Sequence, residues 1–293
     1  MHVNWSEFEK LDGLKFSPAD FRETLDGGQS FTWYESADSS ASEPSYEGVF
    51  GKNAARFKLD KDGNVQYARP SNLPSAKKAA EEYLDAKRNY AKIRNALART
   101  GDASMLRALR IYPTLRILRQ SPQDAIISFI CSSSKRIVQI KQCVRLLSEN
   151  FGEEICGGLF SLPSFERLAD ADAAKIRGCK LGFRAEYLSK SAKKICADKF
   201  EPLSLREIPY SEAKKYLVSL SGVGEKVADC ILLFGASRME AFPVDTWIKQ
   251  AMTELYRTPD NADKIRAFAA EKFGVHAGFA QQLIFAAKRK NLL

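Results

Sequence analysis

Hydrophobic and polar positions alternate over short segments in the first 75 residues of the chain. These segments are rich in aromatic and β-branched residues and are separated by turn signals, which favours strands. They are SFTWYES (30–36), YEGVFG (46–51), AARFKLD (54–60) and NVQYARP (64–70). Asp62-Gly63-Asn64 predicts a hairpin turn between the last two, because glycine and asparagine tolerate positive φ. We therefore expect a small antiparallel sheet.

The pattern changes after residues 70–74, where apolar residues begin to recur three and four positions apart. That spacing places them on one face of a helix. From Ser75 onward every element is expected to be helical. The expected helices include residues 75–99, 103–111, 121–134, 137–151, 164–177 and 186–199. We predict an α+β fold that is mostly helical, with an N-terminal antiparallel sheet subdomain at 1–85 and a helical domain at 86–293.

Residues 211–249 predict a helix, a glycine-rich hairpin, a second helix, a loop and a third helix. Ser211 is the expected cap of the first helix, and Ser221-Gly222-Val223-Gly224 forms the hairpin. Two glycines two positions apart permit a tight reversal and leave backbone N–H groups that can bind phosphate. Because Lys226 follows two residues after the hairpin glycines, the stretch 211–235 is interpreted as a DNA-binding element with a nucleophilic lysine built into it.

Lys226, Cys230 and Asp245 are the candidates for chemistry in this stretch. Lys226 and Cys230 are four positions apart, so they share one face of the second helix. An unprotonated lysine is a nucleophile, although a lysine beside such a hairpin is more often a phosphate contact. Asp245 is a candidate N-cap for a helix at 246–256. It can also face Lys226 and take part in proton transfer or charge stabilisation.

Two segments far from the hairpin can also meet a ligand. Gly27-Gly28-Gln29-Ser30 permits a close approach of the backbone, or it is a plain turn into a strand. Near the C-terminus, Gln281 and Phe285 are four positions apart on one helix face. The pair offers an amide for a base edge and a ring for its flat side, or it is a core phenylalanine with a surface glutamine.

Polar and basic residues between helices are further candidates for DNA contacts. Ser134 and Lys135 belong to Ser132–Arg136, which can meet phosphates or bases or be a solvated turn. Phe183 stands beside Arg184 in a short connector. This pairing suits a side chain that wedges into or stacks on bases, and a half-buried phenylalanine beside a surface arginine gives the same pattern.

Charge narrows the class of partner. The chain has 45 Lys and Arg against 36 Asp and Glu, a formal net charge of +9, which favours polyanions, and nucleic acid first, as partners.

Six scattered cysteines form no C-x-x-C pair, which argues against a zinc ribbon or an iron–sulfur loop. The two histidines, His2 and His276, lie near no candidate nucleophile in the sequence, which argues against a histidine-based metal site or a Ser-His-Asp triad. A polar N-terminus and the lack of a long apolar run predict a cytoplasmic, nucleoid-associated protein with no membrane contact.

Taken together, the motifs resemble the 8-oxoguanine DNA glycosylase/AP lyase family of the helix-hairpin-helix superfamily. The resemblance spans nearly the whole chain in the family's order. It is carried by Gly28-Gln29-Ser30-Phe31-x-Trp33, Phe129-Ile130-Cys131-Ser132-Ser133, Leu181-Gly182-Phe183-Arg184-Ala185, Gly222-Val223-Gly224-x-Lys226-Val227-Ala228-Asp229-Cys230, Pro243-Val244-Asp245 and Gly278-Phe279-Ala280-Gln281.

The resemblance implies a bifunctional enzyme that excises 8-oxoguanine from double-stranded DNA and then cleaves the strand, acting as a monomer and without a cofactor. Its cleft would lie between two helical subdomains. Lys226 would attack C1′ and Asp245 would stabilise developing charge. The flipped base would lie between Cys230 and Phe285, with Gln281 at its Watson–Crick edge and the Gly28 carbonyl at N7–H. DNA contacts would come from Gly222, Val223, Gly224, Phe183, Arg184, Ser134, Lys135, Trp247 and Lys249.

The resemblance also implies that hairpin carbonyls around Val218, Leu220 and Val223 can hold a structural monovalent cation, with no catalytic metal. Some positions depart from the family's pattern. Ser134 stands where members selective for cytosine carry asparagine, and Gln139 stands where they carry arginine. Phe183 replaces a tyrosine and Trp247 a histidine. We therefore expect relaxed discrimination of the base opposite the lesion.

Two alternatives remain open at this stage. One is a glycosylase for another damaged base, such as an alkylated purine, against which Lys226 counts because that branch generally lacks the hairpin lysine. The other is a non-catalytic DNA-binding module, in which Lys226 is only a phosphate contact and Asp245 only a helix cap. A covalent adduct with DNA separates these alternatives.

Overall fold

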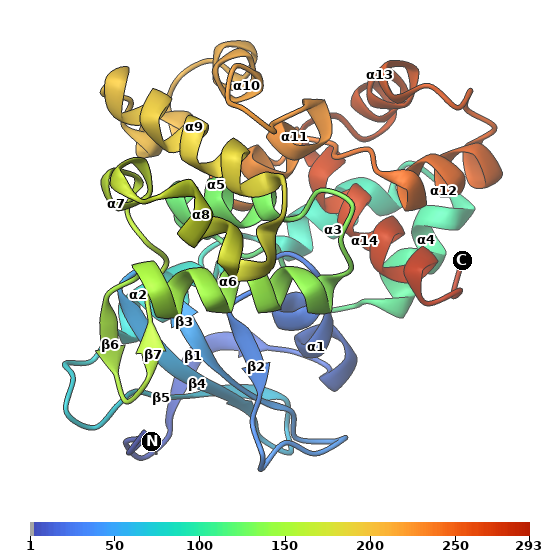
Figure 1. Cartoon of the computed structure of the whole chain (residues 1–293). Coiled ribbons are helices and arrows are strands. Elements are labelled where there is room, and N and C mark those ends of the chain that lie inside the picture. Colours follow the sequence, from blue (N-terminus) through green and yellow to red (C-terminus); the bar gives the residue numbers. More distant parts are fainter. Residues whose placement is uncertain (1–2) are drawn as a thin grey trace.

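An antiparallel sheet occupies one end of the molecule and helices fill the rest (Figure 1). The computed structural model describes residues 3–293, so His2 lies outside the described part of the chain. The five strands follow the order β1-β5-β4-β3-β2. They are β1 (Glu9–Lys15), β2 (Trp33–Glu35), β3 (Ser45–Phe50), β4 (Asn53–Leu59) and β5 (Asn64–Ala68).

Buried aromatic and aliphatic side chains of the strands form the core of the N-terminal part. The Trp33 ring stacks on Phe57 with ring centroids 4.8 Å apart, and its indole N–H donates to the Tyr83 hydroxyl at 2.7 Å. Gly63 has φ +78° in the turn between β4 and β5. The hairpin that Asp62-Gly63-Asn64 predicts is therefore confirmed, because an L side chain seldom adopts that angle.

Two N-terminal elements have weak sequence signals and were not expected. Strand β1 buries only Leu11 and Leu14, three positions apart, because its pairing with β5 is interrupted by an irregularity. Helix α1 (Pro18–Asp26) follows directly. The sequence at its start does indicate a helix: Ser17 accepts a hydrogen bond from the Asp20 N–H, and Pro18 fills the first helical position.

Thirteen further helices of the α type make up most of residues 75–293, so the prediction of a mostly helical α+β fold is confirmed. They are α2 (Lys77–Tyr83), α3 (Tyr90–Ala98), α4 (Ala103–Ile111), α5 (Pro122–Cys131), α6 (Ile137–Phe151), α7 (Phe165–Asp170), α8 (Ala173–Ile176), α9 (Arg184–Ala197), α10 (Tyr210–Val218), α11 (Glu225–Phe234), α12 (Thr246–Tyr256), α13 (Ala262–Phe273) and α14 (Ala277–Arg289). Short helices of other types cover Arg177–Leu181, Pro202–Arg206 and Gly274–His276.

Two of the expected helices each divide into two. The stretch 75–99 divides into α2 and α3, because Asp85 adopts φ +52° and its buried carboxylate accepts a hydrogen bond from the Tyr90 hydroxyl at 2.9 Å. The stretch 164–177 divides into α7 and α8, and Asp172 caps the second by accepting from the Ala174 N–H. Side-chain periodicity predicted one continuous helix in each stretch, and an aspartate that is buried or caps a helix interrupts it.

The expectation that every element after residue 75 is helical was wrong at one place. Strands β6 (Glu154–Cys156) and β7 (Leu159–Phe160) form a small antiparallel hairpin. Gly157 and Gly158 turn it with φ +55° and +88°. Helix starts also differ slightly: α10 begins at Tyr210 with Pro209 at its N-cap, so Ser211 is not the cap.

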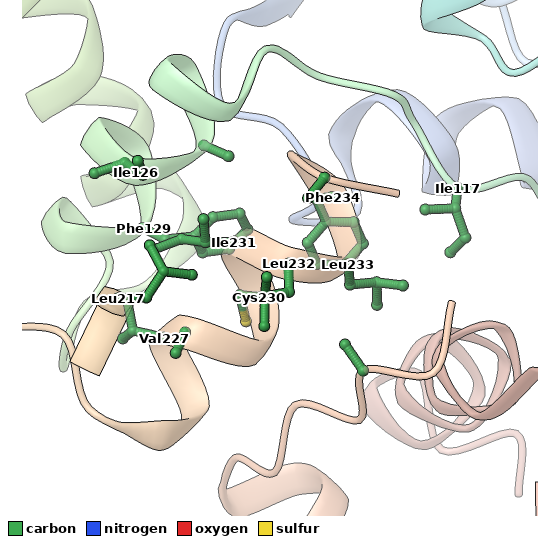
Figure 2. Packing of buried hydrophobic residues seen from close by; sticks show 14 of the residues in the cluster. Ile117, Ile126, Phe129, Leu217, Val227, Cys230, Ile231, Leu232, Leu233 and Phe234 are labelled. Carbon is green, nitrogen blue, oxygen red and sulfur yellow. The ribbon is translucent and has the colours of Figure 1, made fainter. Parts of the chain in front are cut away.

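Packing around α11 builds the core of the helical part. Figure 2 shows Val227, Cys230 and Ile231 of α11 among other buried residues, near Ile126 and Phe129 of α5. A second apolar cluster lies under the sheet and includes Leu118, which comes from beyond α4. The subdomain boundary at residue 85 remains a prediction. No helix within residues 3–293 has the length and apolar character needed to cross a membrane.

Candidate active site

The glycine hairpin links α10 to α11 and is held from the side by α9. Gly222 has φ +78°, and a Cβ on it would lie 2.5 Å from the Tyr187 ring. The Ser191 hydroxyl donates to the Ser221 carbonyl at 2.9 Å. Gly224 caps α11 in an extended conformation and is exposed. The hairpin thus has the conformation predicted for it, with the N-terminus of α11 open toward the surface.

Lys226 lies in the first turn of α11, on the edge of a cavity of about 400 Å³. The cavity is lined by Gly28, Phe31, Phe129, Ser132, Lys135, Arg136, Ile137, Val138, Ile140, Lys226, Asp245, Trp247, Phe285 and Arg289. The Lys226 ammonium nitrogen is 5.9 Å from the centre of the Phe129 ring. Because α5 and α11 pack together through buried residues, the lysine stem extends from a fixed surface toward this cavity.

Asp245 lines the same cavity, so the structure brings Lys226 and Asp245 together. One carboxylate oxygen of Asp245, Oδ1, accepts the Ile248 N–H at 2.8 Å and caps α12. The prediction of an N-cap is therefore confirmed. The cap also fixes the carboxylate at the cavity edge, because a carboxylate held by a backbone N–H has few orientations left.

Cys230 and Gln281 are both buried, and neither lines the cavity itself. Burial raises the pKa of the Cys230 thiol to about 11, although nearby Lys226 lowers it. The side chain is therefore a neutral thiol near neutral pH. The Gln281 amide nitrogen donates to the Pro243 carbonyl at 3.2 Å, and within residues 3–293 its buried oxygen has no hydrogen-bond partner.

Gly28 reaches this cavity from the opposite end of the sequence. It has φ +101°, and an added Cβ would lie 3.1 Å from Ile137 Cδ1. The next residue, Gln29, is buried and anchored: its amide donates to the Arg116 carbonyl and accepts from the Leu118 N–H, both at 2.9 Å. Gly28, Lys226 and Phe285 therefore converge on one site from three distant parts of the chain.

The residues predicted to contact DNA lie in different environments, and only some of them line the cavity. Lys135 and Trp247 line the cavity, and Trp247 is 43% exposed. Phe183 is 55% exposed. Ser134 is exposed in a left-handed conformation. Lys249 lies within 3.1 Å of the Asp260 carboxylate, so this lysine already has a partner.

Arg184 differs from the exposed contact that the sequence suggested. Its side chain is largely buried, its guanidinium donates to the Ser133 carbonyl, and it lies 4.3 Å from the centre of the Phe183 ring. This arrangement ties the start of α9 to the loop between α5 and α6. Arg184 therefore positions Phe183 and the loop between α5 and α6. Phe183 and Ser134 of that loop are the side chains exposed to solvent.

Several residues that line the cavity were not predicted from the sequence. Phe31 and Phe129 belong to quoted motifs, and their aromatic character was the available signal. Val138 is 78% exposed in the first turn of α6. Nothing in the sequence indicated that Arg289 lines the cavity, because a basic residue near a chain end normally indicates a solvated surface.

The carbonyls predicted to hold a cation are partly occupied by the hairpin itself. The Leu220 carbonyl accepts the Val223 N–H at 3.2 Å. A carbonyl oxygen has a second lone pair, and neutral oxygen donors suit a hard cation. The carbonyls of Val218, Leu220 and Val223 are thus donors of the chemical type that the cation would need, and the cation site itself remains a prediction.

Two family models match adjoining parts of the chain. Residues 127–274 match the model described as HhH-GPD superfamily base excision DNA repair protein. Residues 14–126 match the model of the 8-oxoguanine DNA glycosylase N-terminal domain. Gly28 and Phe31 of the cavity lie in the N-terminal match, whereas Lys226 lies in the other, so the cavity draws on both.

Similar proteins carry related names. The N-glycosylase/DNA lyase OGG1 of Arabidopsis thaliana is 31% identical over 287 residues, which cover 90% of this chain and 76% of that protein. A solved structure of MBOgg1 with a low affinity DNA ligand has a TM-score of 0.86 and 32% identity, covering 99% of both chains. The 8-oxoguanine glycosylase/lyase of Clostridium acetobutylicum, solved with double-stranded DNA containing cytosine opposite 8-oxoG, has a TM-score of 0.84 and 30% identity over 99% of both chains.

Proposed function

Since this chain belongs to the 8-oxoguanine DNA glycosylase family of the HhH-GPD superfamily, we propose that it excises 8-oxoguanine from double-stranded DNA and cleaves the resulting abasic site. The observation that carries this proposal is the shared cavity, where Lys226, Asp245, Gly28 and Phe285 meet. A base must leave the duplex to be reached, and the cavity offers aromatic walls for it.

Lys226 is the proposed nucleophile. Its neutral amine forms a bond to C1′ while the bond from C1′ to the base breaks, and the electron pair leaves with the base, which takes up a proton. Ring opening of the sugar then gives a Schiff base between Lys226 and C1′, which allows β-elimination to break the bond from C3′ to oxygen. Asp245 is proposed to stabilise the positive charge that develops on the sugar.

Selectivity is proposed to rest on a backbone carbonyl and a buried amide. 8-Oxoguanine has an N7–H that guanine lacks, and the Gly28 carbonyl can accept it. An unmade hydrogen bond in a dry site costs on the order of 1–3 kcal/mol. The free oxygen of Gln281 suits the N–H groups of the Watson–Crick edge, and the Cys230 thiol and the Phe285 ring would pack on the two faces of the base.

Borohydride trapping tests the proposal directly. Wild-type protein is expected to form a covalent adduct with a duplex that contains 8-oxoguanine, and Lys226→Gln is expected to form none, because the amide has no amine to attack with. Lys61→Gln, an exposed lysine in the turn between β4 and β5, is the matched control and should trap as well as wild type. Intact DNA binding without any wild-type adduct would instead support a non-catalytic binding module.

A further inference from the structure

An ion pair with a buried carboxylate joins the first helix of the chain to the last. Glu23, in α1, is 1% exposed. One guanidinium nitrogen of Arg289, at the end of α14, lies 2.9 and 2.8 Å from the two carboxylate oxygens of Glu23. Lys290 lies 3.4 Å from the same carboxylate. Since a buried carboxylate requires such partners, α14 is held at one defined position against α1.

On the α1 side, this ion pair supports the turn that carries Gly28. The Gly27 N–H donates to the Glu23 carbonyl at 3.0 Å. A Cβ built on Gly27 would overlap the Glu23 carboxylate, so the carboxylate packs directly against the Gly27 backbone. Gly28 comes next in the chain, and Gln29 beyond it is anchored. A movement of the Glu23 side chain is therefore transmitted to the Gly27–Gly28 step.

On the α14 side, the same ion pair reaches the aromatic wall of the cavity. The Arg289 guanidinium carbon lies 5.7 Å from the centre of the Phe285 ring. Arg289 lines the cavity together with Gly28 and Phe285. The pair thus spans from the backbone on one side of the site to the ring on the other.

We propose that Glu23 and Arg289 are positioning residues that set the spacing between the Gly28 carbonyl and the Phe285 ring, and thereby the recognition of the oxidised base. This inference rests on the proposed function. The two residues act through Gly28 and Phe285 rather than on the sugar, so they bear on base excision and not on the reaction of Lys226 with an abasic site.

Asp26 delimits how far this effect extends. The carboxylate of Asp26 binds Lys141 of α6 at 2.7 Å, which fixes the end of α1 independently of Arg289. Loss of the Glu23–Arg289 pair is therefore expected to loosen the Gly27–Gly28 step and the end of α14 without releasing α1 as a whole.

The test compares two DNA substrates in single-turnover experiments with the full-length protein. In Glu23→Gln and Arg289→Met, excision of 8-oxoguanine at saturating protein should slow by at least about tenfold, because a misplacement near 1 Å can cost roughly a hundredfold. Trapping on a duplex with a preformed abasic site, which has no base to position, should stay within about twofold of wild type.

Three further variants make the test specific. Arg289→Lys should recover part of the excision rate, because it keeps the charge. The double variant Glu23→Gln/Arg289→Met should be no slower than the slower single variant, since the two residues act as a unit, and it leaves no buried charge unpaired. Lys288→Met removes the ion pair from α14 to Glu254 outside the cavity and should match wild type.

Equal losses on both substrates would reduce the pair to a structural role and overturn the inference, as would unchanged excision in both single variants. A wild-type protein that traps abasic DNA but leaves 8-oxoguanine in place would overturn the proposed substrate and this inference with it. The two failures are thus distinguished by the wild-type protein alone.

Discussion

At the scale of single residues, the side chains expected from the family resemblance to face the base opposite the lesion, Ser134 and Gln139, are short or already hydrogen-bonded. The Gln139 side-chain oxygen accepts the Arg136 N–H at 3.0 Å at the start of α6. Ser134 is exposed and offers only a hydroxyl on a short stem. Neither carries the charged, two-pronged donor that arginine would supply for a base edge. The sequence-based prediction of relaxed opposite-base discrimination therefore also has a local physical reason.

We expect excision of 8-oxoguanine at rates within about tenfold of one another, equivalent to about 1.4 kcal/mol, when cytosine, adenine, guanine or thymine stands opposite. Single-turnover cleavage of four duplexes that differ only at that base measures this. The same four duplexes with an abasic site in place of the lesion serve as controls for binding. A preference for cytosine beyond that range would contradict the prediction.

At the scale of elements, the hairpin depends on the absence of a side chain at Gly222. Gly222→Ala would combine a left-handed φ, which costs about 1–2 kcal/mol, with overlap on the Tyr187 ring, for which overpacking costs roughly 1–3 kcal/mol. We expect the free energy of unfolding to fall by at least about 2 kcal/mol in urea denaturation.

Gly178→Ala is the control for this prediction, because its Cβ would meet open space and its φ is ordinary. It should change the free energy of unfolding by less than about 0.5 kcal/mol. If Gly222→Ala were equally mild, the packing of the hairpin on α9 would not be the constraint that the structure indicates.

At the scale of the whole molecule, the N-terminal sheet is completed by residues from later in the chain. Leu118 belongs to the apolar cluster under the sheet, and the buried side chain of Gln29 is satisfied by backbone around Arg116 and Leu118. The Tyr83 carbonyl accepts the Arg119 N–H at 2.8 Å. A fragment that ends at residue 85 would leave these groups without partners.

We therefore expect the fragment 1–85 to lack a cooperative thermal transition, whereas the fragment 1–120 should regain sheet structure because it restores these contacts. Circular dichroism during heating, with amide chemical-shift dispersion in NMR spectra, measures both. A well-dispersed spectrum from 1–85 would show that the sheet folds by itself and that the predicted boundary also separates independent units.

Sequence by itself determined what depends on neighbours along the chain. Helical periodicity placed most helices, the paired glycines placed the hairpin, and Asp245 was recognisable as a cap because a cap bonds to a backbone N–H three residues away. The resemblance added Gly28, Gln281 and Phe285 as partners of Lys226, which the local pattern of each residue had left undecided between site and core.

Only the tertiary structure decided how distant residues meet. The burial of Arg184 follows from the contact of α9 with the loop after α5, and the role inferred for Arg289 follows from its contact with Glu23, 266 positions earlier. A charged side chain has the same local signature on a surface and in a buried pair. Its surroundings depend on how separate elements pack, and this packing brings residues from the two ends of the chain together in one site.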